Sequence, residues 1–593
     1  MEDKAAAEKD LPRWNLNDLY EGPDSASLEA DLDRAAGLSE AFAERYRGRL
    51  GDLDGTALGA AIAAYEEIGE IVGKVIAYAQ LLFAADTGDP QTGRFYQGVR
   101  ERTTDISSET LFFTLEINRL SDEALSAMLA APEAARYAPW IRDLRVFRPH
   151  QLADNQEKLL LEKSPSGRAA WVRLFEETFA EMRFTIDGEK STLSDTLNLL
   201  SDKDGATRRQ AAQALGAELG ENLRLLALIT NTLAKDKQTE DRWRNYPRPV
   251  SERNLGNLVE DGVVDALAGS VAEACPELSH RYYRLKAGWF GATELDYWDR
   301  NAPLPDAGDR RYTWDQAREL VLGAFAGFAP EIADIARRFF EGRWIDAEPR
   351  AGKDSGAFSH PTVPSVHPYI LMNFHAKARD VSTLAHELGH GVHQVLSSVQ
   401  GGLMAETPLT LAETASVFAE MLAFKAMLDE EDKAARRRVL LAGKVEDMLN
   451  TVVRQIAFHK FETMVHEERQ DGELAPERLG DMWIEVQGQS LGPAIRFDKE
   501  YRNYWAYIPH FVHTPFYVYA YAFGDCLVNS LYQVFQSGAP GFRDKYLDML
   551  RAGGTLRHKE LLAPFGLDAS DPDFWKRGLK VISSLIDELE AMG

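Results

Sequence analysis

Residues 386–398 read HELGHGVHQVLSS and contain the pattern from which the fold and the chemistry are most directly inferred. In an α-helix, His386 and His390 are one turn apart, so their imidazole rings project from the same face. Two imidazoles at this spacing can bind one Zn²⁺, at about 2.0–2.1 Å from each nitrogen. Glu387 lies beside them, where its carboxylate can reach a water molecule without ligating the metal. The segment therefore predicts a helix that carries two metal ligands and a general base.

The sequence around this motif predicts an amphipathic helix. Its apolar stripe consists of Leu384, Leu388, Val392 and Val395. Ser382 or Thr383 is expected to cap the N-terminus of the helix, and Gly401 to end it. Gly389 costs about 1 kcal/mol relative to alanine inside a helix. We therefore expect another group to approach the helix closely at this glycine.

A catalytic zinc site needs a third protein ligand and an open fourth position. His393 lies near the same face, but position i+7 of a helix is about 10 Å along the axis from position i, so three ligands from one helix would be awkward. A second helix is predicted with Thr407 as its N-cap and Pro408 as its first residue, and it carries Glu413 and Glu420 on one face. Both glutamates lie among apolar residues, and buried carboxylates need partners. Spacing alone leaves open which of them would ligate the metal.

Two runs of sequence resemble one known family. The run 386–398, together with LAETASVFAEML at 411–422, is similar to the M3 family of zinc metallopeptidases. More narrowly, it resembles the oligoendopeptidase F branch, which is related to thimet oligopeptidase. The resemblance implies that Glu413 is the third ligand of a single Zn²⁺. Glu420 matches the second acidic residue of the family, and we assign to it the orientation of a ligand histidine.

The similarity extends over most of the chain. Further segments that resemble the family are LPRWNLNDLYEG at 11–22, PYILMNFHAKARDVSTLAHE at 368–387 and IPHFVHTPFYVYAYAFG at 508–524.

Residues 501–521 contain six tyrosines and two histidines. Tyrosine and histidine can donate hydrogen bonds to a developing oxyanion, but a tyrosine-rich core with satisfied hydroxyls would give the same composition. In the family, a histidine and tyrosines of this region face the zinc and help to bind the tetrahedral intermediate. The matching residues here are His510, Tyr517 and Tyr519, with Tyr521 as an alternative and His513 as a weaker one.

Most of the chain has apolar residues at three- and four-residue steps, which predicts a mostly α-helical protein. Strands are expected at 182–186 in an Asp-Gly hairpin, at 295–298, and at 367–374 before the zinc helix. The last of these strands could pair with an extended peptide or be an ordinary buried strand. The family resemblance implies a two-lobed helical shell with a deep central channel. We place an N-terminal helical lobe at 1–204 and the catalytic region at 205–593.

The composition excludes several classes of partner. With 67 Lys and Arg against 93 Asp and Glu, the chain has a net charge of −26. This charge repels nucleic-acid phosphates and anionic lipids, so neither nucleic acid nor a membrane is expected as a partner. The sequence contains only Cys275 and Cys526, which favours a reducing compartment. Its charged first residues lack the apolar stretch of a secretory signal. We expect a cytoplasmic protein, and the sequence predicts no particular oligomeric state.

These features predict a zinc-dependent oligoendopeptidase that cleaves internal bonds of short, unstructured peptides, with Glu387 as the general base. One alternative is an exopeptidase on the same fold, such as a dipeptidyl carboxypeptidase, which needs a cation to hold the substrate C-terminus. Cations near the aromatic segment are Arg496, Lys499 and Arg502. A second alternative is a catalytically silent peptide-binding protein, against which the intact motif argues.

Overall fold

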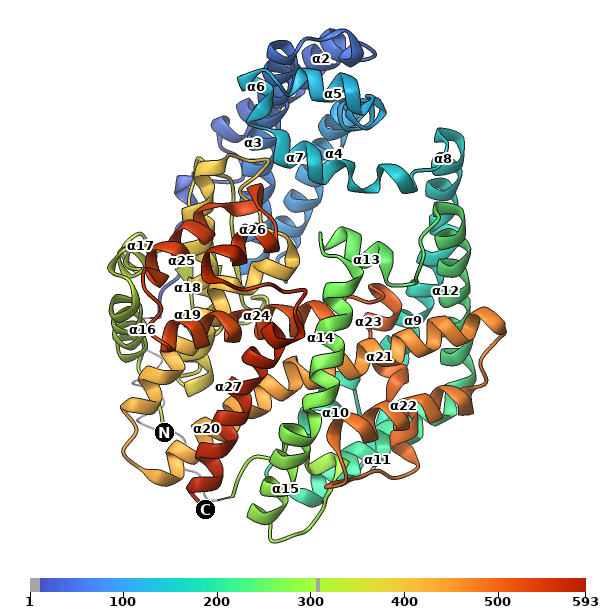
Figure 1. Ribbon diagram of the computed structural model, residues 1–593, viewed down its shortest axis with the longest axis vertical. Helices are drawn as coiled ribbons and strands as arrows, with labels where there is room; N and C mark the ends of the chain where they lie inside the picture. Colours follow the sequence, from blue (N-terminus) through green and yellow to red (C-terminus); the bar gives the residue numbers. More distant parts are fainter. Residues whose placement is uncertain (1–10, 306–309) are drawn as a thin grey trace. The chain divides into compact units, whose positions relative to one another are not determined.

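Helices form most of the structure, a computed structural model that describes residues 11–305 and 310–593 (Figure 1). The predicted mostly helical class with a few short strands is confirmed. The chain divides into two compact units of three segments each. Unit 1 comprises 11–148, 310–431 and 537–566, and unit 2 comprises 149–305, 432–536 and 567–593. The charged first ten residues lie outside the described part of the chain.

The predicted division at residue 204 falls inside unit 2, between α10 (Leu193–Leu199) and α11 (Gly205–Glu221). These two helices pack against each other, so the compact units are not separated there. A functional boundary at residue 204 stays a prediction.

Unit 1 contains the predicted metal-binding helix α18. Its helices are α2 (Ala26–Tyr46), α3 (Gly55–Ala85), α4 (Pro90–Arg119), α5 (Asp122–Met128), α6 (Pro132–Ala135), α7 (Ala138–Leu144), α16 (Trp314–Phe328), α17 (Pro330–Glu341), α18 (Ala378–Ser397), α19 (Leu409–Asp429), α25 (Phe542–Arg551) and α26 (His558–Leu562). By length and composition α3 could cross a membrane, but 50% of its most apolar window is buried in the structure. Since α3 packs against α2, α4 and α6, it serves as a core helix of this unit.

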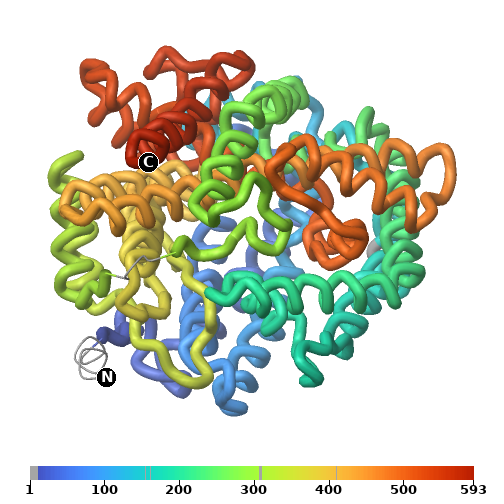
Figure 2. The backbone as a smooth tube through the Cα atoms, turned by 90° about the horizontal axis from the view of Figure 1, so that it is seen from below, coloured from blue at the N-terminus to red at the C-terminus, as the bar shows by residue number. Residues whose placement is uncertain are grey.

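Unit 2 contains the predicted aromatic segment. Its helices are α8 (Asp154–Lys163), α9 (Arg168–Glu181), α10, α11, α12 (Leu223–Arg244), α13 (Ser251–Gly256), α14 (Asp261–Ala274), α15 (Ser279–Trp289), α20 (Ala434–Thr451), α21 (Val453–Glu468), α22 (Pro476–Leu491), α23 (His510–His513), α24 (Tyr519–Gln536) and α27 (Pro572–Ala591). Segments far apart in sequence lie side by side, as α14 and α27 do (Figures 1 and 2). The two cysteines are buried free thiols.

Two small sheets in unit 2 agree with the predicted strands. β1 (Phe184–Ile186) and β2 (Glu189–Ser191) form an antiparallel hairpin. Asp187 and Gly188 between them have positive φ angles of 50° and 84°, as the predicted Asp-Gly turn requires. β3 (Leu295–Asp296) pairs in parallel with β7 (Ile495–Arg496).

A three-stranded sheet in unit 1 precedes α18. Its order is β4 (Ile345–Asp346), β6 (Tyr369–Leu371) and β5 (Phe358–His360). β6 is the predicted strand within 367–374, and it pairs in parallel with β4 and antiparallel with β5. The idea that a peptide pairs with this strand is therefore wrong, because both edges of β6 are already occupied. β5 is an outer strand of the sheet.

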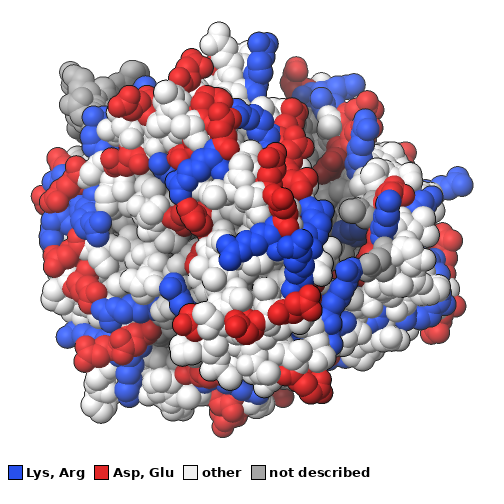
Figure 3. Space-filling model, turned by 90° about the horizontal axis from the view of Figure 1, so that it is seen from above, with Lys and Arg blue, Asp and Glu red and all other residues white. Residues whose placement is uncertain are grey.

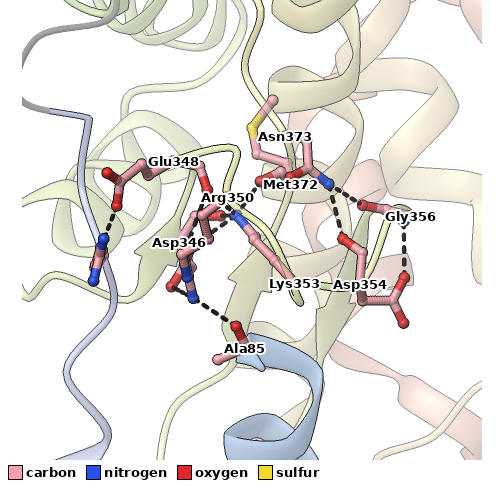
Figure 4. A network of polar contacts seen from close by, with 10 residues as sticks. Ala85, Asp346, Glu348, Arg350, Lys353, Asp354, Gly356, Met372 and Asn373 are labelled. Carbon is pink, nitrogen blue, oxygen red and sulfur yellow. Dashed lines mark hydrogen bonds and ion pairs between the residues drawn. The ribbon is translucent and has the colours of Figure 1, made fainter. Parts of the chain in front are cut away.

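A buried ion network fixes this sheet (Figure 4). The Lys353 ammonium lies 2.7 Å from Asp346 Oδ1 and donates to the carbonyl oxygens of Asp346, Glu348 and Met372, at 3.1, 3.0 and 2.6 Å. The Lys353 side chain is 0% exposed and that of Asp346 1%. Arg350 adds a second cation, 2.6 Å from Asp346 Oδ1. The network joins the ends of β4 and β6, so it fixes β6, the strand that pairs with β5.

Replacing Lys353 by methionine is expected to lower the free energy of unfolding by about 3 kcal/mol, because three buried carbonyls lose a donor and Asp346 loses a cation. Urea unfolding followed by circular dichroism measures this change. Lys545→Met, at an exposed position in α25, is the matched control and should change stability by less than about 0.5 kcal/mol. Equal effects of the two substitutions would show that the network contributes no stability.

Candidate metal centre

The helix that carries the two histidines begins earlier than the sequence predicted. α18 starts at Ala378 rather than after Ser382 or Thr383. The cause is Asp380 in its first turn, whose carboxylate accepts the backbone N–H groups of His375 and Lys377 at 2.7 and 2.8 Å. This local side-chain to backbone pairing satisfies donors at the helix start and so fixes an earlier N-terminus.

The expected end of α18 is confirmed. The helix ends at Ser397 and passes through a short 3₁₀ turn to Gly401, which has a φ of 86°. α19 begins at Leu409, one residue later than predicted, with Pro408 rather than Thr407 at its N-cap position. The two helices are thus joined by a short connection and can pack closely.

α18 and α19 approach each other closely at Gly389. A Cβ atom at this position would lie 2.6 Å from the carbonyl oxygen of Ala415 and 2.7 Å from Cα of Ser416. Both contacts are with backbone atoms of α19, which cannot move aside cheaply. The expected close approach is confirmed, and it explains why a residue unfavourable in helices stands between the two histidines.

His386, His390 and Glu413 lie together, and their ligand atoms are within 4.8 Å of one another. Glu413 Oε2 is 3.4 Å from His386 Nε2 and 3.5 Å from His390 Nε2. Ser416 donates a hydrogen bond of 2.6 Å to the same oxygen. All three side chains are partly exposed, at 27%, 20% and 32%. Two imidazoles and one carboxylate form a donor set that suits zinc and leaves room for a further ligand.

Glu420 lies behind His386, as predicted. Its Oε2 is 3.4 Å from His386 Nδ1, on the opposite side of the ring from Glu413. Burial acts to lower the pKa of His386, but the hydrogen bond to Glu420 and the charges of Glu387 and Glu413 outweigh it and raise this pKa. A carboxylate in this position fixes the ring orientation and the tautomer of a ligand histidine.

Glu387 is 5% exposed and lies outside the group of potential ligands. Its pKa is raised to about 7, chiefly by burial and also by the charge of Glu413, against the opposing effect of His386. The backbone of Ser359 in β5 forms a hydrogen bond to this carboxylate. The side chain of Glu387 therefore extends from α18 to the outer strand β5, which restrains it.

Ser359 and Gln394 are positioning residues that the sequence did not reveal. Ser359 Oγ donates to Gln394 Oε1 at 2.8 Å, and Gln394 Nε2 donates to Ser359 O at 3.0 Å. Gln394 is seven residues after Glu387, so it lies on the same face of α18. This spacing was the available signal, but it did not indicate a strand as the partner.

A pocket of about 480 Å³ lies beside the metal ligands, because His390 is part of its wall. The rest of the wall includes His393 and residues from 361–368 and 402–407. Two glutamates of α3 anchor these segments: Glu70 accepts the N–H of Ser365 at 2.9 Å, and Glu66 accepts that of Leu403 at 3.2 Å. The site therefore has adjoining space for part of a substrate.

The predicted aromatic residues lie in unit 2 and are described within that unit. His510 Nε2 is 3.3 Å from the hydroxyl of Tyr521, and the His510 ring lies 6.1 Å from the ring of Tyr517. Tyr519 is 0% exposed, and its hydroxyl accepts a hydrogen bond of 2.8 Å from Asn257. His513 lies 3.3 Å from Glu176. The structure groups His510 with Tyr517 and Tyr521, and it places Tyr519 in the core.

Comparisons with known proteins agree with these observations. Residues 198–581 match the family model described as Peptidase family M3, and residues 116–184 match the model described as Oligopeptidase F. Oligopeptidase PepF of Bacillus subtilis (strain 168) is 27% identical over 595 residues, which cover 98% of this chain and 87% of that protein. Group B oligopeptidase PepB of Streptococcus agalactiae serotype III (strain NEM316) is 28% identical over 536 residues, or 87% of each chain.

Two solved structures show the same fold. A Chlamydophila abortus crystal structure has a TM-score of 0.88 at 23% identity and covers 98% of each chain. The crystal structure of oligoendopeptidase-F from Enterococcus faecium has a TM-score of 0.69 at 21% identity, covering 95% of this chain and 99% of that one.

Replacing Gly389 by alanine is expected to destabilise the protein by about 1–3 kcal/mol, because the added methyl group would overlap the backbone of α19. Helix propensity alone would give a gain of about 1 kcal/mol. Thermal unfolding measures the sign of the change. Gly323→Ala in α16 is the matched control, since nothing lies within 4 Å of its added Cβ, and it should stabilise. A stabilised Gly389→Ala variant would contradict the close packing.

Proposed function

The chain belongs to peptidase family M3, and on that premise we propose that it is a zinc-dependent oligoendopeptidase acting on short, unstructured peptides. The observation that carries the proposal is the arrangement of His386, His390 and Glu413 around one point, with Glu387 buried beside them. This arrangement combines a three-ligand metal group with a carboxylate that does not ligate, which is the set of groups that metal-assisted peptide hydrolysis needs.

His386, His390 and Glu413 would hold the ion. When bound, zinc supplies Lewis-acid chemistry: it lowers the pKa of water and polarises a carbonyl group. Glu420 keeps His386 in the orientation that presents Nε2 to the ligand group. Ser416 fixes the carboxylate of Glu413 by its hydrogen bond. Two of the three proposed ligands are thus positioned by further contacts.

Glu387 is the proposed general base. Its carboxylate takes a proton from the attacking water and later returns it to the leaving amine. Burial keeps this carboxylate away from bulk water, and the backbone of Ser359 restrains its position. A base whose pKa lies near neutrality can both accept and release the proton within one turnover.

His510 and Tyr517 are proposed to donate hydrogen bonds to the oxyanion that develops on the substrate carbonyl. Tyr521 is a better candidate than Tyr519, because its hydroxyl lies near His510 whereas that of Tyr519 is bound to Asn257. Burial and the charges of His513 and Arg454 lower the pKa of His510. A neutral imidazole can still donate one N–H to an oxyanion.

An endopeptidase is favoured over an exopeptidase by the state of the cations considered for holding a substrate C-terminus. Arg496 is paired with Asp296 at 2.6 Å and Arg502 with Asp481 at 2.5 Å. Lys499 is 88% exposed and lies 3.5 Å from Glu500. Each of these three side chains thus lies beside a surface carboxylate, so none of them is a free cation for a substrate C-terminus.

The surface charge favours peptides over nucleic acids or anionic membranes as partners, and the two buried free thiols support our proposal of a cytoplasmic protein. Figure 3 shows acidic and basic side chains interspersed over one face of the molecule, so the basic groups there lie among acidic ones. With a net charge of −26, such a surface gives little attraction for polyanions. We propose small, unstructured peptides as the substrates.

Glu387→Gln is expected to lower kcat by about 10²–10⁴-fold, because it removes the proton acceptor, while zinc content stays at one ion per chain. The assay uses an internally quenched peptide of about ten residues, blocked at both ends, with mass spectrometry of the products. A length of this order lets an extended chain of about 33 Å span the site. Glu341→Gln, at an exposed end of α17, is the matched control. A zinc-loaded wild type that leaves the blocked peptide intact would refute the endopeptidase proposal.

Glu420→Gln is expected to weaken zinc binding by about 10–100-fold, since His386 loses its orienting carboxylate. Competition with a chelator measures the affinity. A variant that binds zinc as tightly as the wild type but unfolds at a lower temperature would assign Glu420 a purely structural role.

A further inference from the structure

Unit 2 contains a small cavity with two arginines in its wall. The cavity has a volume of about 40 Å³. Arg300 and Arg454 line it, together with Asn301 and a set of large aromatic residues: Tyr297, Trp298, Trp483, Tyr501, Tyr504 and Tyr507. Its aromatic walls are buried, with Trp483 at 2% exposure and Tyr504 at 4%. Two positive charges therefore face a confined space with largely apolar walls.

The neighbouring cations have anionic partners. Arg208 lies 2.6 Å from Asp299, and Lys286 lies 2.5 Å from Glu446. Lys286 also donates to the carbonyl oxygen of Arg300 at 2.8 Å, which places this cation next to the arginine. The carboxylates of Asp299 and Glu446 are thus already paired with other cations. Asp498 interacts with Tyr297, and its Oδ2 is buried without a hydrogen-bond partner, but within the described residues it forms no ion pair with either arginine of the cavity.

Arg300 and Arg454 have no such partner. Within the described part of the chain, no carboxylate oxygen lies within 4.0 Å of either guanidinium. A guanidinium cannot lose its proton in a protein, and a charge in a confined, poorly hydrated place needs compensation. The two arginines therefore leave an excess of positive charge at the cavity.

Hydrogen-bond donors are also in excess here. The guanidinium of Arg454 donates to the hydroxyl of Tyr507 at 3.4 Å, and that of Arg300 to the hydroxyl of Tyr501. Arg300 Nε and Trp483 Nε1 are buried without a hydrogen-bond partner. The cavity wall thus offers N–H groups to an acceptor that the chain itself does not supply.

We propose that this cavity binds a small monovalent anion, either a free ion such as chloride or the carboxylate of a bound peptide. Two guanidinium groups, a tyrosine hydroxyl and an indole N–H form a donor set suited to such an anion. The volume admits an ion or a carboxylate head, and it is too small for a nucleotide or a sugar phosphate.

The cavity lies close in sequence to the proposed catalytic His510, and the charge of Arg454 acts on that residue. Tyr507 is three residues before His510, and the charge of Arg454 acts on the imidazole of His510. An anion between the arginines would reduce that influence. Anion binding is therefore expected to change peptide turnover as well as stability.

The test for a free ion measures the melting temperature of the full chain in sodium chloride, at constant ionic strength set with sodium methanesulfonate, whose anion is larger than chloride and carries no carboxylate. Chloride should raise the melting temperature saturably, and Arg454→Gln should raise the half-saturating concentration by about tenfold. Arg454→Lys tests the same point if the glutamine variant does not fold. Arg478→Gln, which removes a paired surface arginine of unit 2, is the matched control and should respond as the wild type does.

The test for a peptide carboxylate rests on the proposed function. Matched peptides with a free or an amidated C-terminus should differ at least several-fold in KM, and the difference should disappear in Arg454→Gln. A crystal soaked in sodium bromide should show an anomalous peak between Arg300 and Arg454.

Either a saturable chloride effect that needs Arg454 or a carboxylate-dependent KM that needs it supports the proposal. A flat melting temperature, equal KM values and no bromide peak would together overturn it. A saturable chloride effect in a protein that cleaves no peptide would leave the anion site standing and refute only the peptidase proposal.

Discussion

The contact on which the candidate site depends is the backbone-to-backbone approach of α18 and α19 at Gly389. A glycine is needed there because any side chain would overlap Ala415 and Ser416. The approach brings Glu413 to within 3.5 Å of both histidines, although it lies 23 residues after His390 in sequence. A metal group of this kind needs its ligands fixed to within about 0.5 Å, which a close helix pair can provide and a flexible loop cannot.

The sheet contributes the second constraint, on Glu387 rather than on the ligands. Lys353 joins β4 to the end of β6, β6 pairs with β5, and Ser359 in β5 contacts both Glu387 and Gln394 of α18. The buried ion network thus constrains β6, the pairing of β6 constrains β5, and β5 constrains the proposed base. The candidate metal ligands and the proposed base are therefore positioned by different parts of unit 1.

The candidate site could be predicted further from sequence than the fold around it. The spacing of His386 and His390 is local, so helix geometry alone places both on one face, and the cost of Gly389 correctly indicated a close neighbour. The choice of Glu413 over Glu420 needed resemblance to a family, because both lie on one face of α19. The start of α18 was predicted too late, because Ser382 and Thr383 are good capping residues and the hydrogen bonds of Asp380 to the preceding backbone were not foreseen. The pairing of β6 on both edges, the core position of Tyr519 and the charge excess at Arg300 all arise from contacts between distant segments, which periodicity does not reveal.

The assembly of each unit from three separated segments has a consequence for how the protein is made. Unit 1 is complete only when residues 537–566 have been synthesised, and these end 418 residues after residue 148 (566 − 148). At about 5–20 residues per second, the first helices must wait about 20–80 s on the ribosome for their last partners. During that interval α7 lacks the 3₁₀ turn at Gly553–Thr555, against which it packs in the finished protein. The newborn chain is therefore a candidate for chaperone binding.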